Sequence, residues 1–157
     1  HHRLVGGNFR LDALQAVVLH VKLPHLDSWA EGRRQNAAEI ERRYLEHGGR
    51  TWEEGGIAFP REAAGCHHVF NQFVVRIARG RRDLLKDRLA ELKIGHAIYY
   101  PVPLHLQECF ANLGGKPGDF PVAEKAALET LALPVFPELT PSQKAFLAYH
   151  LAQFSKE

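Results

Sequence analysis

Residues 68–100 read HVFNQFVVRIARGRRDLLKDRLAELKIGHAIYY, and this stretch decides the fold class. The β-branched and aromatic residues of 68–77 predict a strand. Leucines at helical spacing over 83–92 predict an amphipathic helix, and Gly95 separates it from a second strand over 97–100. A strand, a helix and a strand in this order predict a small mixed α/β lobe.

The first of these strands carries polar residues on both faces. Because side chains alternate along a strand, Gln72 falls on one face and Asn71 on the other, each among apolar neighbours. Neither face is cleanly apolar. We therefore expect part of this strand to line a cleft rather than to lie wholly in a core.

The second strand continues into IYYPVPLHLQ at residues 98–107, a segment rich in hydrogen-bonding side chains. Pro101 and Pro103 fix φ and remove two backbone donors. Two tyrosine hydroxyls, an imidazole and a side-chain amide come together within this one segment. Such a composition is more typical of a shaped polar wall than of an interior strand.

Two helices precede the lobe. Apolar residues at helical spacing over 11–21 predict a helix with one buried face, and Pro24 separates it from a second helix that ends near His47. Gly48 and Gly49 stop the second helix. Its mixed charges indicate a solvated face: Glu31, Arg33, Arg34, Glu39, Glu41, Arg42 and Arg43. We divide the chain into a helical segment at 1–48 and a small α/β domain at 49–157.

The remainder of the chain completes the lobe. Residues 50–64 contain Gly55, Gly56 and Pro60 and predict a loop. A helix is expected over 122–131, an extended segment over 133–137, and a last helix over 141–154 with Thr140 as its N-cap.

Composition narrows the function classes. Lys and Arg total 20 against 18 Asp and Glu, a formal charge of +2, so we expect no nucleic-acid partner. No apolar run approaches the ~20 residues of a membrane span and no signal peptide is recognised, so we expect no membrane partner and a cytoplasmic location. Cys66 and Cys109 lack metal-site spacing, and no metal is expected.

The common catalytic and nucleotide-binding motifs are missing, including the Walker loop, GxGxxG, HExxH and GxSxG. Gly6, Gly7 and Asn8 precede a predicted helix, where backbone N–H groups and an amide could bind an anion. A turn closed by an asparagine cap explains the same residues. Spacing alone leaves both interpretations open.

Five motifs occur in order along the chain: GGNFRLDALQA at 6–16, HVFNQF at 68–73, YPVPLHLQ at 100–107, FPVAE at 120–124 and LPVFPEL at 133–139. Together they resemble the signatures of the DegT/DnrJ-type nucleotide-sugar aminotransferases. The first is similar to that family's Gly-x-Asn-x-Arg-x-Asp-x-Leu-Gln-Ala motif, and the third to its Tyr-Pro-x-Pro-Leu-His-Leu-Gln segment.

The resemblance implies a fold-type I enzyme that uses pyridoxal 5′-phosphate (PLP) to move an amino group from glutamate to a nucleotide-linked keto-sugar. It implies only the C-terminal part of such an enzyme, with 1–48 as the helical link between a large and a small domain. In the family the Schiff-base lysine lies upstream of the first motif. The lysines present here fall on predicted helices, their ends or polar loops: Lys22, Lys86, Lys93, Lys116, Lys125, Lys144 and Lys156. We therefore expect this chain alone to be inactive.

The resemblance also assigns cofactor-binding residues. Asn8 matches the asparagine that reaches the PLP phosphate of the partner subunit, which implies a homodimer with shared active sites. Arg10 matches a neighbour of that asparagine, and an ion pair between Arg10 and Asp12 is an equally good explanation for it.

Substrate-binding residues are assigned in the same way. Tyr100 and His105 match positions that line the sugar-nucleotide side of the cleft, although a solvated strand end and a surface-loop imidazole remain alternatives. Gln107 is either a ligand or a partner of the loop backbone. Asn71 stands where many relatives have histidine, so hydrogen bonding is expected there without proton transfer. His96 matches no motif and is expected to be structural.

The form of the third motif is more similar to relatives that aminate C3 of a 3-keto sugar than to those that act at C4. A second hypothesis is a non-catalytic sugar-nucleotide-binding regulatory or interaction protein of the same fold. The upstream sequence discriminates between them, because a histidine or another residue at the lysine position would favour dehydratase-like or non-enzymatic relatives.

Overall fold

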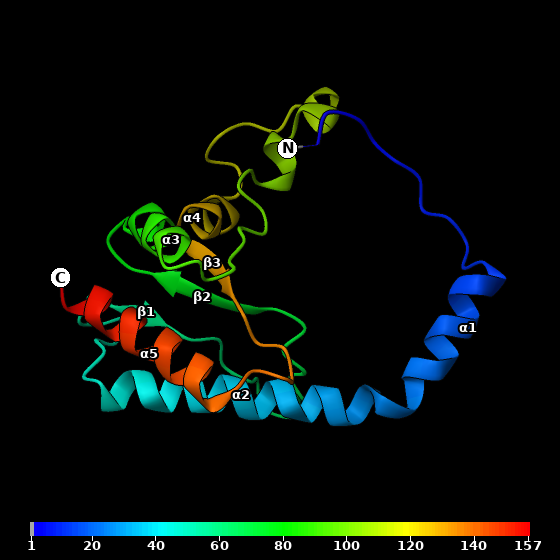
Figure 1. Ribbon diagram of the computed structural model, residues 1–157. Helices are drawn as coiled ribbons and strands as arrows, with labels where there is room; N and C mark the ends of the chain where they lie inside the picture. The colour runs from blue at the N-terminus through cyan, green and yellow to red at the C-terminus, as the bar shows by residue number, and fades with distance from the viewer. Residues whose placement is uncertain (1) are drawn as a thin grey trace.

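The computed structural model describes residues 2–157 and shows an α/β lobe with an N-terminal helical arm (Figure 1). Its elements in chain order are α1 (Ala13–Lys22), the 3-10 turn η1 (Leu23–His25), α2 (Leu26–Glu46), β1 (Ile57–Ala58), β2 (Phe73–Ile77), α3 (Arg82–Glu91), the 3-10 turns η2 (Leu104–Leu106) and η3 (Glu108–Leu113), α4 (Pro121–Glu129), β3 (Thr130–Leu133) and α5 (Pro141–Lys156). The predicted mixed α/β lobe behind a long helical segment is confirmed.

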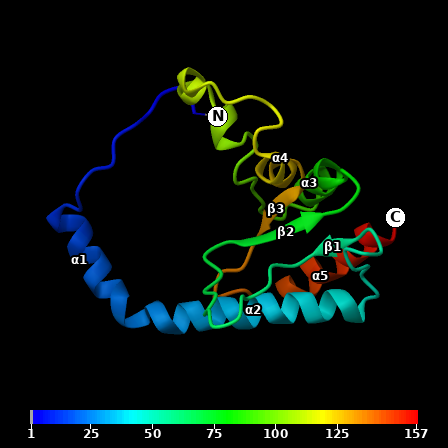
Figure 2. The same ribbon diagram turned by 180° about the vertical axis from the view of Figure 1, so that it is seen from behind.

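The sheet is antiparallel and has the strand order β1-β2-β3. Ile57 pairs with Ile77 at one edge of β2, and Phe73 pairs with Leu133 at the other. Helices α2 and α5 lie on one side of the sheet and α3 and α4 on the other, as both views show (Figures 1 and 2).

A single hydrophobic core joins the helices to the sheet. Phe73, Val75 and Ile77 are buried on β2, as the alternation of a strand requires. Helix α2 contributes Ile40 and Tyr44, and the other helices contribute Leu85, Leu89, Leu147 and Leu151. Each such side chain stabilises the fold by roughly 1.5–3 kcal/mol when fully buried. Because α2 packs into this core, the core includes residues on both sides of the predicted domain boundary at residue 48. The division of the chain into two domains at that residue stays a prediction.

A polar clasp, formed by Asn36, Glu39 and Lys144, ties α2 to α5. The Lys144 ammonium pairs with the Glu39 carboxylate and donates to Asn36 Oδ1 at 3.1 Å. Asn36 Nδ2 in turn donates to the carbonyl oxygens of Phe136 at 2.8 Å and Pro137 at 3.3 Å. The hydrogen bond from Lys144 holds the pKa of Glu39 below its usual value. This part of the charged face of α2 is therefore packed rather than solvated, contrary to expectation.

Helix ends follow local chemistry. Thr140 caps α5 through a reciprocal capping box with Gln143, as its predicted N-cap role requires. Gly48 takes a φ of 71° just after α2, which favours glycine at that position. Asp12 is the N-cap of α1 and accepts from the backbone N–H of Gln15 at 2.8 Å.

Two predicted strands are shorter than expected. The strand predicted over 68–77 begins only at Phe73, because Phe70 has a φ of 45° and the chain turns there. The strand predicted over 97–100 is reduced to one bridge between Ala97 and Ala132. The prolines that follow prevent a longer ladder at this edge.

Two further boundaries also differ. The helix predicted over 122–131 ends at Glu129, and residues 130–133 form β3 instead of continuing the helix. Pairing with β2 outweighs helix periodicity here, since Leu131 lies opposite Val75. The predicted loop at 50–64 contains the short strand β1.

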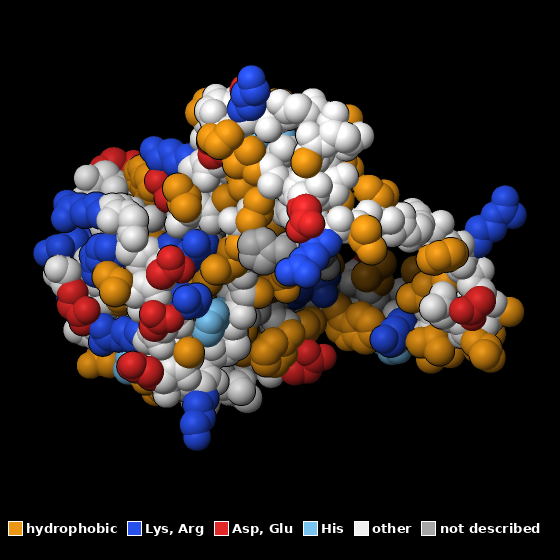
Figure 3. Space-filling view, turned by 90° about the horizontal axis from the view of Figure 1, so that it is seen from above, with side chains coloured by type: hydrophobic (Ala, Val, Ile, Leu, Met, Phe, Trp, Pro, Cys, Tyr) orange, Lys and Arg blue, Asp and Glu red, His pale blue; other side chains and the backbone are white. Residues whose placement is uncertain are grey.

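Helix α1 forms as predicted, but the expectation of one buried face is wrong for this chain. None of its residues is buried, and its large apolar side chains are more than half exposed: Leu14, Val17, Val18, Leu19 and Val21. Residues 2–12 form an extended arm that runs from the neighbourhood of η3 to α1 (Figure 1). In the space-filling view, apolar side chains gather at the end of the molecule that carries α1 (Figure 3). Within residues 2–157, no element packs over this face. No helix within the described residues has the length and apolar content needed to cross a membrane.

Candidate functional site

A cleft of about 560 Å³ opens beside β3, and we name it the strap cleft after the strap at residues 134–137 that forms one wall. The turn before β2, the chain after α3 and the first half of α2 form the remaining walls. Its lining residues with polar side chains are Arg33, Asn71, Gln72, His96 and Tyr99. The prediction that the segment around Asn71 meets a cleft is therefore confirmed.

Hydrogen bonds to α2 fix the segment that carries Asn71. The Arg34 guanidinium pairs with Glu62 and donates to the carbonyl oxygen of His68 at 2.7 Å. Glu62 also accepts from the backbone N–H of His68 at 2.9 Å, and the Arg34 hydrogen bond lowers the pKa of Glu62. The His68 imidazole then accepts from the N–H of Phe70 at 2.9 Å. These contacts present Asn71 and its neighbour to the cleft from a constrained turn.

Gln107 holds its own loop. It is only 4% exposed, its Nε2 donates to the carbonyl oxygen of Val102 at 2.7 Å, and its Oε1 accepts from the N–H of His2 at 2.8 Å. The second of the two interpretations of Gln107 fits these contacts, because both ends of the amide are engaged by backbone groups. Proline removes the alternative donors in this segment, which explains why a side chain is needed.

His105 lies on η2 and is turned inward. Its Nε2 lies 3.0 Å from Glu124 Oε1, and its ring packs against Phe120 at a centroid distance of 4.8 Å. Glu124 also accepts from the backbone N–H groups of Gly118 and Phe120, and the Gly118 contact is the main cause of its lowered pKa. With a side chain 12% exposed, His105 is neither a loose surface residue nor an open ligand in this conformation.

Tyr100 is open to solvent. Its side chain is 62% exposed, with the rings of His2 and Tyr99 at centroid distances of 5.9 Å and 6.1 Å. Tyr99, rather than Tyr100, lines the strap cleft. The structure therefore brings Asn71 and Tyr99 into one cleft, and leaves Tyr100, His105 and Gln107 outside its lining.

Four cleft residues were not assigned to the site from the sequence, namely Arg33, Gln72, His96 and Tyr99. Gln72 and Tyr99 adjoin residues that were singled out, so the motif itself was a sufficient signal for them. Arg33 was interpreted as part of a solvated face and His96 as structural, and the latter does contact the carbonyl oxygen of Ile94 at 2.9 Å. Only the packing of α2 against the strap places Arg33 at this cleft.

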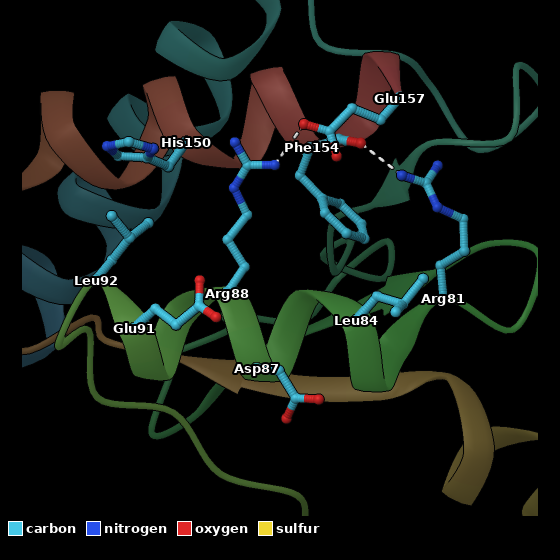
Figure 4. A pocket seen from close by; sticks show the side chains of 9 residues that line it. All are labelled: Arg81, Leu84, Asp87, Arg88, Glu91, Leu92, His150, Phe154 and Glu157. Carbon is cyan, nitrogen blue, oxygen red and sulfur yellow. Dashed lines mark hydrogen bonds and ion pairs between the residues drawn. The ribbon is translucent and has the colours of Figure 1, made fainter.

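A second hollow, of about 750 Å³, lies between α3 and α5 (Figure 4). Arg88 pairs with Glu157, and Arg81 donates to the carbonyl oxygen of Phe154 while its guanidinium lies over that ring. None of the residues predicted for the site lines this hollow. Because the residues predicted for the site lie elsewhere, we place the candidate site at the strap cleft despite its smaller volume.

Asn8 and Arg10 lie on the arm that precedes α1, and both are exposed. Within residues 2–157 no ion pair joins Arg10 to Asp12, whose carboxylate instead caps α1. The ion-pair explanation of Arg10 is thus not realised in this conformation. Both side chains are free to approach an anion outside the chain.

The family model of the DegT/DnrJ/EryC1/StrS aminotransferase family matches residues 1–148. This chain belongs to that family. Its fold is accordingly the C-terminal part of a fold-type I aminotransferase, and the cofactor that family membership indicates is pyridoxal 5′-phosphate.

Individual relatives agree with this placement. A pleiotropic regulatory protein of Geobacillus stearothermophilus is 45% identical over 154 residues, which are 98% of this chain and 40% of the relative. A UDP-N-acetyl-3-dehydro-alpha-D-glucosamine 3-aminotransferase of Acidithiobacillus ferrooxidans is 40% identical over 148 residues, 94% of this chain and 37% of the relative. The X-ray structure of S. venezuelae DesV superposes with a TM-score of 0.82 at 34% identity, and covers 100% of this chain and 40% of that one. The chain thus spans less than half the length of the proteins it matches.

The residues present fit one part of this cofactor. An amide and a guanidinium on the arm suit its phosphate group. Among residues 2–157, no lysine side chain is buried. Lys144 is the most covered of those in ion pairs, at 11% exposed, and it is held by Glu39 and Asn36.

Proposed function

We propose that the protein containing this chain transfers an amino group from glutamate to a nucleotide-linked keto-sugar. The observation that carries the proposal is the family match over residues 1–148. The names of several relatives specify amination at the 3-position of UDP- or dTDP-linked sugars, and they support a 3-keto substrate. The cofactor supplies the electron sink and the temporary carrier of the amino group.

The residues of this chain would bind and orient rather than react. Asn8 and Arg10 would hold the cofactor phosphate, in a partner subunit if the arm extends to it, which makes a homodimer with shared sites part of the proposal. Asn71 and Tyr100 would hydrogen-bond the sugar nucleotide. His105 joins them if its contact with Glu124 opens, whereas Gln107 would act through the shape of its loop.

The first experiment tests the absence of a suitable lysine. The 157-residue chain is mixed with PLP, its absorbance is recorded in the region of a lysine–PLP imine, and the mixture is reduced with borohydride. We expect no stoichiometric label by mass spectrometry. A label at a single lysine would contradict the proposal that the reactive lysine lies elsewhere in the complete protein.

The second experiment measures the two half-reactions of the complete protein by stopped flow. We expect glutamate to convert the cofactor to its aminated form, and a 3-keto sugar nucleotide to reverse the change. Replacement of His105 by Ala should slow the sugar half-reaction by about ten- to hundred-fold, the effect of losing one hydrogen bond to a charged group, while the glutamate half-reaction changes little. Equal damage to both would indicate a structural role for His105.

A regulatory protein of the same fold is the second candidate. Two relatives carry names of this kind, a pleiotropic regulatory protein and an erythromycin biosynthesis sensory transduction protein. The residue at the Schiff-base position of the complete protein separates the two candidates. A lysine there, with amino transfer, supports the enzyme, and its replacement supports the regulator.

A further inference from the structure

Arg33 differs from the other arginines of α2. Arg34, Arg42 and Arg43 each pair with an acid side chain. Within residues 2–157, Arg33 makes no ion pair, although it lies on the same helix. It is also the arginine that lines the strap cleft. An unpaired guanidinium in a concave site is suited to an anion from outside the chain.

The orientation of Arg33 is already set. Its Nε donates to the carbonyl oxygen of Val69 at 3.0 Å, and Val69 belongs to the turn that Arg34 anchors through His68. This contact uses one edge of the planar guanidinium and leaves both terminal nitrogens, Nη1 and Nη2, to bind. A guanidinium fixed in this way loses little conformational entropy when it binds a carboxylate through two parallel hydrogen bonds.

The lining of the strap cleft contains no aspartate or glutamate. The hollow between α3 and α5 is different, because Asp87, Glu91 and Glu157 stand there beside its arginines. The charge of Arg33 is therefore not compensated by the walls around it. Asn71, Gln72 and Tyr99 add neutral hydrogen-bonding groups that could contact the rest of a small polar molecule.

We propose that Arg33 binds a carboxylate of the amino donor in the strap cleft, an inference that rests on the proposed function. Glutamate carries a net charge of about −1 at neutral pH, because its ammonium offsets one of its two carboxylates, and one guanidinium balances that charge. A nucleoside diphosphate brings at least two negative charges and no ammonium to a cleft whose lining has no lysine. The apolar walls formed by Pro134, Val135 and Phe136 suit the methylene groups of a dicarboxylate.

The binding test uses the complete protein and calorimetry with glutarate, a dicarboxylate that has no amino group to transfer. We expect R33Q to weaken glutarate binding by about ten- to hundred-fold. R33K should restore part of the affinity, since lysine keeps the positive charge but lacks the planar pair of N–H donors of the guanidinium. R42Q is the matched control, because Arg42 lies on the same helix outside the cleft, and it should bind glutarate normally. Circular dichroism checks that each variant is folded.

The kinetic test separates a binding role from a structural one. R33Q should raise the KM for glutamate and leave the sugar half-reaction unchanged, and R33K should recover part of the loss. Equal binding of glutarate by R33Q and R42Q would overturn the assignment, and so would inorganic phosphate that binds as tightly as glutarate and depends equally on Arg33. If Arg33-dependent glutarate binding is found but no amino transfer occurs, the carboxylate site stands and the proposed function fails.

Discussion

At the residue scale, Gln107 shows how a motif position can be structural. It sits in the motif segment at 100–107, yet both ends of its amide contact backbone groups and its side chain is almost fully buried. A buried polar group that loses its partner costs more than the hydrogen bond itself contributes. The primary role of Gln107 is therefore to hold the loop that carries His105, and any effect on a ligand would follow from the shape of that loop.

Replacement of Gln107 by Leu should lower stability. The change leaves the carbonyl oxygen of Val102 without its donor, and we expect a loss of about 1–3 kcal/mol, or roughly 2–12 °C in Tm. Thermal unfolding followed by circular dichroism measures it. Gln35→Leu is the control, because Gln35 is exposed and contacts only Glu31 one turn away. Equal Tm values for the two variants would contradict the structural role of Gln107.

His150 makes stability depend on pH. Its Nδ1 is buried and has no hydrogen-bond partner within the described chain, and burial followed by the nearby charge of Arg88 lowers its pKa. Because the unfolded chain binds this proton more readily, the contribution of His150 is fully present above about pH 6.5 and is lost as the pH falls toward the lowered folded value.

We therefore expect wild-type protein to lose more stability between pH 8 and pH 5.5 than the His150→Leu variant does. Urea unfolding at both values gives the two differences. Glu39 and Glu62 do not contribute to this difference between pH 8 and pH 5.5. Their pKa values are lowered, so both carboxylates remain ionised at pH 5.5 and affect stability only at lower pH. A variant with the same pH dependence as wild type would rule out His150 as the cause.

At the scale of elements, local signals predicted the helices well and the strands poorly. Helix α5 carries its own start signal in Thr140 and Pro141, and α2 ends at glycines, so both boundaries are local. The strand β3 and the single bridge at Ala97 depend on partners far along the chain. The same difference between local and long-range signals holds for the site. Asn71 could be predicted because it belongs to a sequence motif, whereas Arg33 reaches the cleft only through tertiary packing.

The polar clasp gives an element-scale prediction for α2 and α5. Lys144→Met removes one of the two cationic partners of Glu39, whose carboxylate is one-quarter exposed and also pairs with Arg43, and a double-mutant cycle with Glu39→Gln should give a coupling of about 1–2 kcal/mol. Denaturant unfolding supplies the four stabilities. Lys125→Met is the comparison, because Lys125 is mostly exposed and pairs with Glu129 at 3.8 Å, and its effect should stay below about 0.5 kcal/mol. A coupling near zero between Lys144 and Glu39 would show that the polar clasp does not stabilise the packing of α2 against α5.

At the scale of the whole molecule, the arm and α1 extend away from the lobe and expose apolar residues (Figure 3). The sequence predicted the helix but not its exposure, because periodicity identifies an apolar face and not what covers it. The chain spans at most 40% of the first relatives it matches, and we expect the rest of the protein or a partner subunit to cover this face.

Asn8→Ala in the complete protein should weaken retention of PLP without unfolding it. Asn8 is exposed on the arm and makes no hydrogen bond within the described chain, so its loss should not change the stability of the lobe. Equilibrium dialysis gives cofactor affinity and sedimentation gives the oligomeric state. Unchanged affinity would count against the phosphate-binding assignment, and a monomer with full activity would count against shared sites.

The hydrogen bonds from Asn36 to the strap also have a consequence for ligand affinity. Because they secure Phe136 and Pro137 to a helix of the hydrophobic core, the wall of the strap cleft keeps its shape before any molecule enters. A ligand then binds without the entropy cost of ordering that wall, which would otherwise be roughly 0.5–1.5 kcal/mol for each immobilised side chain. Asn36 thus raises the affinity of the cleft for a ligand although Asn36 itself does not line the cleft.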